Sequence, residues 1–392
     1  MNERERSLEL LQRIERESLY ATIVLQGESG FVRTIVLGVL RWRSRLDDAI
    51  EALAGRRLSK IDRNVVDILR VGLYQLAFMA VPPHAAVSET VDLAGRHARR
   101  AKGFVNAVMR KATAGLPEPR DAATRLGHPK WLFDRWVATY GAARAEAIAE
   151  SNQQLSYPDV LVLEGPPPEG SAASELVPDV VRLTGSSAEL DRRRFHPMDE
   201  GSAVIAAIAA ATGGEVLDLA AAPGGKSLYL RHRGRRVVSN DVSLARLRPL
   251  AGRDLRAVVS DGRRPPFRRR FETVLLDAPC SATGTIRKNP EIKWRLREAD
   301  LASFAALQRE LLASALQLSA GVCVYSTCSL EPEENDAVVR GVLDSEPAFV
   351  IDDVAQYAPG GTQRFVERGV LRLTPDSGTD GFTAFVLRRK ER

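Results

Sequence analysis

The chain has 392 residues, of which 44% are apolar and 27% charged, as in ordinary folded proteins. With 29 Gly and 21 Pro, its composition excludes a fibrous or a disordered chain. No apolar run approaches the ~20 residues that span a bilayer, and the first ten residues lack the apolar core of a signal peptide. We therefore expect a cytoplasmic protein of two or three domains with no membrane partner.

Basic residues exceed acidic residues by six, and this excess is confined to the N-terminal part of the chain. Residues 1–120 contain 20 Lys and Arg against 14 Asp and Glu, whereas the rest of the chain is balanced. Of the 56 basic residues, 48 are Arg, whose planar guanidinium suits phosphate. A basic N-terminal module indicates a polyanionic partner such as nucleic acid. A high-GC genome that favours Arg codons would produce the same composition on a merely solvated surface.

The first 115 residues predict a helical bundle. Apolar residues recur at helical spacing at Leu8, Leu11 and Ile14, and again at Ile61, Val65, Leu69 and Leu73. A linker-like stretch and a helix near 130–151 follow, and residues 152–195 contain short β-like runs. We expect an all-α domain over residues 1–120, then a linker and small α/β subdomain over residues 121–197.

From residue 200 onward, short apolar strands alternate with helices. Strands are expected at 215–220, 236–241, 256–261, 271–277 and 321–327, with a helix over 299–319 before the last of them. This alternation predicts an α/β, Rossmann-like domain over residues 198–392 with a mostly parallel, doubly wound sheet.

The sequence VLDLAAAPGGKS, residues 216–227, places small residues and a Pro-Gly-Gly turn directly after a strand. Small residues let the backbone approach a ligand closely at the carboxyl edge of a sheet. The stretch lacks the G-x-G-x-x-G pattern of dinucleotide sites and the full P-loop pattern. A simple tight turn is the structural alternative.

Four successive strands end in or near an aspartate, at Asp218, Asp241, Asp261 and Asp277. A single Asp in this position is commonplace as a helix cap. Four at one edge of a sheet indicate a nucleoside-type ligand, because a carboxylate there can accept ribose hydroxyls. Without a pyrophosphate loop, S-adenosylmethionine is the best candidate.

Two of the three cysteines also follow strand ends, Cys280 in DAPC and Cys328 in STCS. Because neighbouring strand ends lie close together, we expect both thiols to line one cleft. Cys323 falls inside a strand and is expected to be a buried structural residue. No His lies near either motif, so we expect no metal site, and a disulfide is not expected in the cytoplasm.

A thiolate beside a methyl donor has a specific use. C5 of a pyrimidine is a poor nucleophile, but addition of a thiolate at C6 makes C5 electron-rich. After methyl transfer, loss of the C5 proton allows elimination of the thiol, which is covalent catalysis.

The motifs resemble those of the Sun-type RNA cytosine-C5 methyltransferases, most closely the bacterial branch that modifies small-subunit ribosomal RNA. VDILRVGLYQLAFM, PPHAAVSETVDLA and GFVNAVMRKA resemble the NusB-like helical domain that opens these proteins. LDLAAAPGGKS, NDVSLARL, DAPCSATGTIRKNPEIKW and YSTCSLEPEEN resemble the catalytic motifs in order. The resemblance implies an N-terminal NusB-like RNA-binding domain and a methyltransferase domain that uses S-adenosylmethionine.

The resemblance also implies roles for individual residues. Cys328 would be the nucleophile at C6, Cys280 would promote product release, and Asp277 would contact the pyrimidine edge. Asp241 would bind the ribose of the cofactor and Asp261 its adenine amino group. The remaining cofactor-binding residues would be Asp218 and the loop formed by Ala220, Ala221, Ala222, Pro223, Gly224, Gly225 and Lys226.

Four basic residues are candidate contacts to RNA phosphates: Lys226, Arg287, Lys288 and Lys293. A solvated charged face is the structural alternative for them. The sequence departs from the family pattern at Ala220, where Cys is usual, at Ala282, where Gly is usual, and at Met198, where Gln is usual. The Arg-x-Asn usually found before Met198 is also missing, in a region that helps to select the RNA.

We therefore predict an enzyme that acts as a monomer and makes 5-methylcytosine in 16S ribosomal RNA. One alternative is a DNA cytosine methyltransferase, which also has a Pro-Cys nucleophile but lacks the second Cys and the helical domain. The other is a non-catalytic RNA-binding factor in ribosome assembly or antitermination. The two strand-end cysteines and four aspartates argue against a purely binding role.

Overall fold

The computed structural model describes residues 2–185, 190–253 and 255–391. The chain forms two compact units, each built from segments that are separate in the sequence. The helical unit comprises Met1–Gln154 and Ile286–Glu298, and the sheet unit comprises Leu155–Thr285 and Ala299–Arg392. No helix among the described residues is long and apolar enough to cross a membrane.

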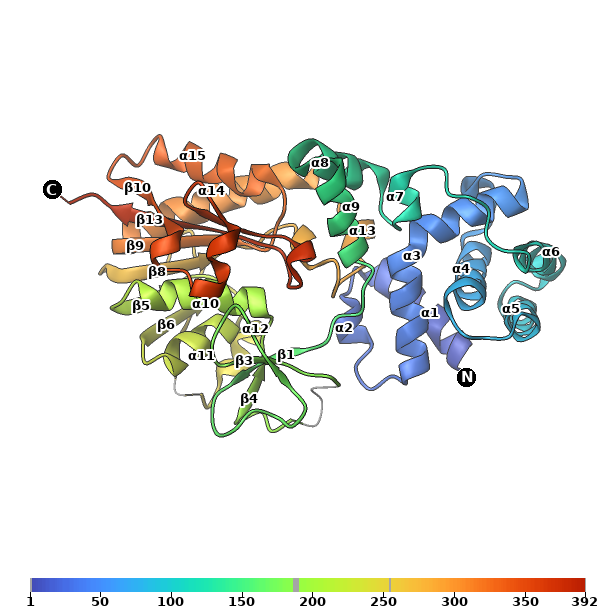
Figure 1. Cartoon of the computed structure of the whole chain (residues 1–392), viewed down its shortest axis with the longest axis horizontal. Helices are drawn as coiled ribbons and strands as arrows, with labels where there is room; N and C mark the ends of the chain where they lie inside the picture. The colour runs from blue at the N-terminus through green and yellow to red at the C-terminus, as the bar shows by residue number, and fades with distance from the viewer. Residues whose placement is uncertain (1, 186–189, 254, 392) are drawn as a thin grey trace. The chain divides into compact units, whose positions relative to one another are not determined.

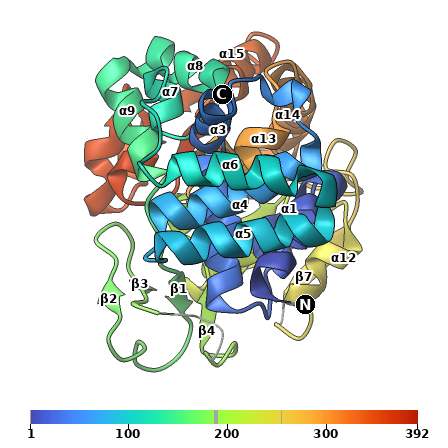
Figure 2. The ribbon, with the colours of Figure 1, turned by 90° about the vertical axis from the view of Figure 1, so that its right-hand side faces the viewer.

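The helical unit has a buried apolar core beneath long amphipathic helices. Polar side chains define where the helices begin: Asn2, Ser29 and Asp62 accept backbone N–H groups at the starts of α1, α3 and α4. Helices α4, α5 and α6 run side by side (Figure 2). The helices are α1 (Glu3–Glu17), α2 (Ala21–Val24), α3 (Gly30–Ala54), α4 (Arg63–Phe78), α5 (Pro83–His97), α6 (Lys102–Ala112), α7 (Ala122–Arg125), α8 (Lys130–Tyr140), α9 (Ala142–Ser151) and α13 (Ile292–Arg295), with 3-10 turns η1 (Leu58–Lys60) and η2 (Arg99–Ala101).

The segment that carries α13 belongs to the core of the helical unit although it lies far along the chain. Trp294 donates its indole N–H to the carbonyl of Leu40 at 2.7 Å. Lys293 is 1% exposed, and its Nζ donates to two backbone carbonyls at 2.7 Å, those of Arg41 and Gly127. Burial lowers the pKa of Lys293 well below its usual value.

These contacts correct part of the predicted phosphate-binding set. Lys293 and Arg287 are both buried in the helical unit, so the prediction that they contact RNA phosphates is wrong for both. Burial inside the helical unit shields both side chains from an RNA phosphate. Lys288 is only half-buried, and its phosphate contact stays a prediction.

The sheet unit begins with a small antiparallel sheet of four short strands. Its strand order is β2-β3-β1-β4, with β1 (Asp159–Val162) paired to both β3 (Val180–Arg182) and β4 (Phe195–Pro197). The edge strand is β2 (Ala172–Ala173). These strands account for the β-like runs expected between residues 152 and 195.

The large sheet has the order β11-β12-β13-β9-β8-β5-β6-β7, and β10 also pairs with β13. Strands β7, β6, β5, β8 and β9 are parallel to one another, as the sequence predicts, whereas all pairings of β10 to β13 are antiparallel. The strands are β5 (Glu215–Asp218), β6 (Arg236–Asp241), β7 (Arg256–Val259), β8 (Phe271–Asp277), β9 (Ser319–Thr327), β10 (Phe349–Asp352), β11 (Val366–Glu367), β12 (Val370–Leu373) and β13 (Phe382–Arg389).

Alternate residues of the central strands enter two separate cores. Val216, Leu275 and Val324 face the core that contains α10 (Glu200–Ala211), and Leu217 and Leu276 face the core that contains α14. Figure 1 shows α10 and α11 on one side of this sheet and α14 and α15 on the other. The remaining helices of the sheet unit are α11 (Gly225–His232), α12 (Leu244–Leu247), α14 (Asp300–Leu318) and α15 (Asp336–Leu343), with the 3-10 turns η3 (Arg248–Leu250), η4 (Thr283–Thr285), η5 (Pro332–Glu334), η6 (Val354–Gln356), η7 (Gly360–Phe365) and η8 (Pro375–Ser377).

The predicted architecture is confirmed: a helical unit is joined to a unit with a mostly parallel, Rossmann-like sheet. The compact units nevertheless divide the chain differently from the predicted segments 1–120, 121–197 and 198–392. Helices α7, α8 and α9 belong to the helical unit, and the small β-sheet belongs to the same unit as the large one, where β1 contacts α10. Packing between distant parts of the sequence sets these limits, and local sequence patterns do not reveal it.

Candidate active site

The chain reverses its winding direction between β5 and β8. From β5 it proceeds outward to β6 and β7, then returns to β8 on the other side of β5 and continues to β9. In doubly wound sheets, ligands bind at the carboxyl ends of the strands that flank such a switch point. Here those ends carry Asp218 on β5 and Asp277 on β8, with Asp241 on β6 and Cys328 directly after β9.

The small-residue loop after β5 donates hydrogen bonds to acceptors on β6. Ala221 donates its N–H to the carbonyl of Asn240 at 2.8 Å, and Ala222 donates to Asp241 Oδ2 at 3.1 Å. Gly224 has φ +107°, and a Cβ at this position would lie 2.1 Å from Leu250. A side chain at this position would be strained and would clash with Leu250, so glycine is required for this turn.

Asp218 is almost fully buried beneath this loop. Its Oδ2 accepts a hydrogen bond from Ser227 Oγ at 2.6 Å, and Ser227 in turn accepts one from Ser239 at 2.8 Å. Its Oδ1 is buried and has no hydrogen-bond partner among the described residues. Burial raises the pKa of Asp218 to about 7 despite the Ser227 hydrogen bond. An unpartnered buried carboxylate oxygen at a ligand-binding edge fits a site for a polar or cationic ligand group.

The other cofactor residues differ in their surroundings. Asp241 is 5% exposed, and both of its oxygens accept backbone N–H groups, from Ala222 and Ser243. Asp261 lies just beyond β7, and its carboxylate forms a bidentate ion pair with Arg263. Hydrogen bonds from Arg263 lower the pKa of Asp261.

Sequence reasoning missed two apolar residues next to these carboxylates. Val242, which follows Asp241, is 69% exposed, and Leu244 is 64% exposed. Large apolar side chains this exposed beside a ligand edge are typical of a surface that an aromatic ring covers. Their position in the sequence directly after a strand-end Asp is the pattern from which a place beside the ligand could have been predicted.

Asp277 is tied to two neighbouring elements. Lys226 Nζ, at the start of α11, donates to Asp277 Oδ2 at 2.6 Å and to Ser202 Oγ at 2.7 Å. Ser326 on β9 donates to Asp277 Oδ1 at 2.8 Å. Although burial acts to lower it, the Asp277 carboxylate raises the pKa of Lys226 above its usual value. Two of the three ammonium donors of Lys226 are engaged inside the site, and its phosphate contact stays a prediction.

The two strand-end thiols lie together, as the sequence predicts. Cys280 Sγ and Cys328 Sγ are 3.3 Å apart without a disulfide, and both residues are partly exposed. The hydrogen bond to Cys328 and burial raise the pKa of Cys280 well above its usual value, so Cys280 stays a neutral thiol. Cys323 is fully buried in β9, in keeping with a structural residue.

The loop after Cys280 turns through Ala282, which has φ 59°. This left-handed conformation carries no side-chain strain in glycine, which accounts for the preference of the family pattern for Gly here. The amide N–H of Gly284 then donates to the carbonyl of Cys328 at 2.9 Å, which joins the two cysteine loops through their backbones.

These residues fit S-adenosylmethionine. The site offers a loop of small residues, an unpartnered buried oxygen on Asp218 and exposed apolar side chains after β6. Next to it stand two thiols and a Lys–Asp ion pair that can contact a base. Among the residues that the structure describes, no group of three or more His, Cys, Asp or Glu side chains could hold a metal ion.

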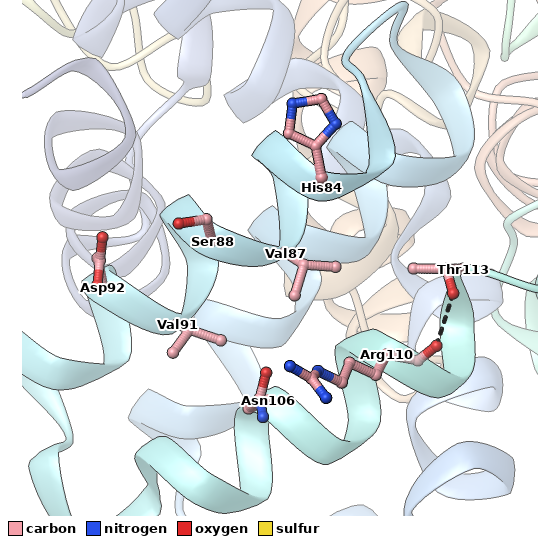
Figure 3. Close-up of a pocket in the computed structure, with 8 residues that line it drawn as sticks. All are labelled: His84, Val87, Ser88, Val91, Asp92, Asn106, Arg110 and Thr113. Carbon is pink, nitrogen blue, oxygen red and sulfur yellow. Dashed lines mark hydrogen bonds between the residues drawn. The ribbon is translucent and has the colours of Figure 1, made fainter.

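A second hollow, of about 510 Å³, lies in the helical unit between α5 and α6. Figure 3 shows His84, Ser88 and Asp92 from α5 and Asn106 and Arg110 from α6 around it. Val87, Val91 and Thr113 complete its lining. It contains no thiol and has charges of both signs, so its chemistry is not that of the sheet-unit site.

The strand order and the switch-point loop define the sheet unit as a Rossmann-like methyltransferase. A family model described as 16S rRNA methyltransferase RsmB/F matches residues 205–388, and the NusB family model matches residues 1–114. Ribosomal RNA small subunit methyltransferase B of Sodalis glossinidius is 32% identical over 371 residues, with 86% of each chain covered. The Vibrio cholerae protein of the same name is 34% identical over 364 residues, with 82% of each covered. The chain therefore belongs to the RsmB/F family of 16S rRNA methyltransferases.

Solved structures agree with this assignment. The crystal structure of PH0851 has a TM-score of 0.78 at 25% identity and covers 99% of each chain. NSun6 from Pyrococcus horikoshii with SFG has a TM-score of 0.57 at 18% identity, covers 67% of this chain and 99% of its own, and shows the fold alone. The resemblance to Sun-type enzymes is confirmed, and the protein is an S-adenosylmethionine-dependent rRNA methyltransferase.

Proposed function

We propose that this methyltransferase modifies C5 of a cytosine in 16S rRNA through a covalent bond between Cys328 Sγ and C6 of the base. The observation that carries the proposal is the pair of thiols 3.3 Å apart beside the Lys226–Asp277 ion pair. Methylation of a base nitrogen or a ribose hydroxyl needs no thiol, because those atoms already carry a lone pair. Methylation of C5 needs one, because C5 becomes nucleophilic only after addition at C6.

The proposed reaction forms and then breaks one covalent bond between the protein and the base. The Cys328 thiolate forms the C6–S bond, and the C5=C6 electron pair moves to C5. S-adenosylmethionine supplies the methyl group when it is bound. Solvent water then removes the C5 proton, the C5=C6 double bond re-forms, and the C6–S bond breaks with its electron pair passing to the sulfur of Cys328.

Cys280 is proposed to act in product release. Its thiol is neutral and lies within hydrogen-bonding distance of Cys328 Sγ. It can therefore deliver a proton to the sulfur of Cys328 as the C6–S bond breaks, and it then regains a proton from water. This placement supports Cys328 as the nucleophile, because a thiol that keeps its proton is a poor one.

Asp277 is proposed to recognise the base, since a carboxylate accepts a hydrogen bond from the cytosine amino group. Lys226 and Ser326 fix the orientation of that carboxylate from two sides. For the cofactor, we propose contacts from Asp218, the loop from Ala220 to Lys226, Asp241, Asp261 and Asp277. The exposed side chain of Val242 is proposed to pack against the adenine.

The helical unit is proposed to hold the RNA. Exposed basic residues gather where α5 ends and α6 begins, at Arg96, Arg99, Arg100 and Lys102. Arg99 and Arg100 are exposed in η2, where they are free to approach a phosphate. This local cluster supports the nucleic-acid interpretation of the N-terminal charge excess.

Tritium release tests the position of methylation. Small-subunit RNA carrying tritium at cytosine C5 is incubated with the full-length protein and S-adenosylmethionine. Tritium should pass to water in a one-to-one ratio with methyl incorporation, and Cys323→Ala, a buried thiol outside the site, should retain this ratio. Methyl incorporation without tritium release would place the methyl group on another atom. The absence of both methyl incorporation and tritium release would favour a binding-only protein.

A further inference from the structure

Glu334 lies at the end of η5, six residues after Cys328, and its side chain is fully buried. Its carboxylate accepts hydrogen bonds from four neutral donors. They are the backbone N–H of Ser281 at 2.9 Å, the hydroxyls of Ser281 and Ser329, and Gln308 Nε2 at 2.9 Å. Among the described residues this carboxylate has no cation partner, so the hydrogen bonds from its four neutral donors must offset the cost of burying its charge.

The groups that Glu334 joins are the residues that follow the two thiols. Ser281 follows Cys280, and Ser329 follows Cys328. The two hydroxyls also contact each other at 3.0 Å. One carboxylate therefore connects the loop after β8 to the loop after β9 at the point where the thiols meet.

Two further residues support the same arrangement. Gln308 of α14 donates to the carbonyl of Pro279 as well as to Glu334, both at 2.9 Å. Asn335 closes the second loop by donating to the carbonyls of Ser329 and Glu331 at 3.0 Å. The carboxylate is thus the centre of a network that spans both cysteine loops.

We propose that Glu334 is a positioning residue that clamps the loop bearing Cys280 to the loop bearing Cys328 and thereby keeps the two thiols in contact. Its catalytic consequence rests on the function proposed above. The fixed negative charge of Glu334 also opposes a second thiolate at Cys280, and it adds to the effects that raise the pKa of that residue. The clamp therefore contributes both to the spacing of the thiols and to their different protonation.

Thiol reactivity in the free protein tests the clamp without RNA. Glu334→Gln removes the charge and keeps the size, Glu334→Ala removes the clamp, and Asp344→Asn removes an exposed carboxylate just after α15 as a matched control. Alkylation of each cysteine by iodoacetamide is followed from pH 6 to 10 by peptide mass spectrometry. Disulfide formation by diamide, which oxidises two thiols to a disulfide and is itself reduced to the hydrazine, reports how closely they approach.

We expect Glu334→Gln to increase the alkylation rate of Cys280 at pH 8 about threefold or more and to retain disulfide formation. Glu334→Ala should reduce the yield of the Cys280–Cys328 disulfide at least fivefold. Both variants should lower kcat with little change in the KM for S-adenosylmethionine. If Glu334→Ala does not fold, the Ser281→Ala, Ser329→Ala double variant tests the same contacts.

Variants of Glu334 whose thiol reactivity and kcat match those of Asp344→Asn would overturn the clamp. The failure of the proposed function is a separate result. Wild-type protein that releases no tritium from C5, while the Glu334 variants still change thiol reactivity as described, would overturn the C5 chemistry and support the clamp.

Discussion

Protonation of Asp218 should control the affinity for S-adenosylmethionine below neutral pH. The pKa of this carboxyl is raised to about 7 by burial, and its Oδ1 has no partner among the described residues. The cofactor carries a sulfonium and an ammonium group, so we expect it to bind when Asp218 is ionised. The ionised fraction rises from about 3% at pH 5.5 to about 50% at pH 7 for a pKa near 7.

Affinity should therefore increase about 15-fold between these pH values, which corresponds to ~1.6 kcal/mol. Titration calorimetry of the full-length protein at pH 5.5, 6, 6.5 and 7 measures this change, and the window lies below the range where the α-amino group of the cofactor titrates, near pH 8. Asp218→Asn cannot ionise, so its affinity should be weak and nearly constant over the same range. Constant wild-type affinity, or an equal slope in Asp218→Asn, would refute the reasoning.

Three further variants test the cofactor site, the buried lysine and the RNA-binding surface. Asp241→Ala should weaken S-adenosylmethionine by roughly 1–3 kcal/mol in calorimetry, because it removes charge-assisted hydrogen bonds, and unchanged affinity would exclude Asp241 from the site. Lys293→Met should lower the free energy of unfolding in urea by about 2 kcal/mol, since two buried hydrogen bonds disappear. Its RNA affinity should keep the wild-type salt dependence, and a reduced salt slope would show that the original phosphate prediction was right. Arg99→Glu with Arg100→Glu should weaken RNA binding at least tenfold and reduce its salt dependence, whereas Arg340→Glu, an exposed residue of the sheet unit, should leave both unchanged.

The geometry of a parallel sheet explains why much of the site could be predicted from residues at the ends of strands. Parallel strands bring their carboxyl ends to one edge, so residues that directly follow them meet whatever their separation in sequence. Asp218 and Asp277 flank the switch point for this reason, and Cys280 contacts Cys328 across 48 residues. Local patterns and one rule of sheet geometry were sufficient for these placements.

Other features depend on packing that local patterns do not record. The basic residues of the 286–298 segment looked like surface groups, but the segment folds into the helical unit and buries Lys293. The contacts of Glu334 could not be predicted from the sequence, because its hydrogen-bond donors lie 5, 26 and 53 residues away along the chain. The antiparallel strands β10 to β12 are short and separated by turns, so they have too little periodicity to predict.

The most direct test of the central claim is to look for a covalent RNA adduct in variants that each lack one of the two site thiols. Cys280→Ser, Cys328→Ser and wild-type protein are incubated with small-subunit RNA and S-adenosylmethionine, and the products are separated on a denaturing gel. If Cys328 attacks C6 and Cys280 assists release, Cys280→Ser should accumulate a shifted band that ribonuclease removes, and Cys328→Ser should give neither adduct nor methylated RNA. An adduct in Cys328→Ser but none in Cys280→Ser would reverse the two roles and contradict this account.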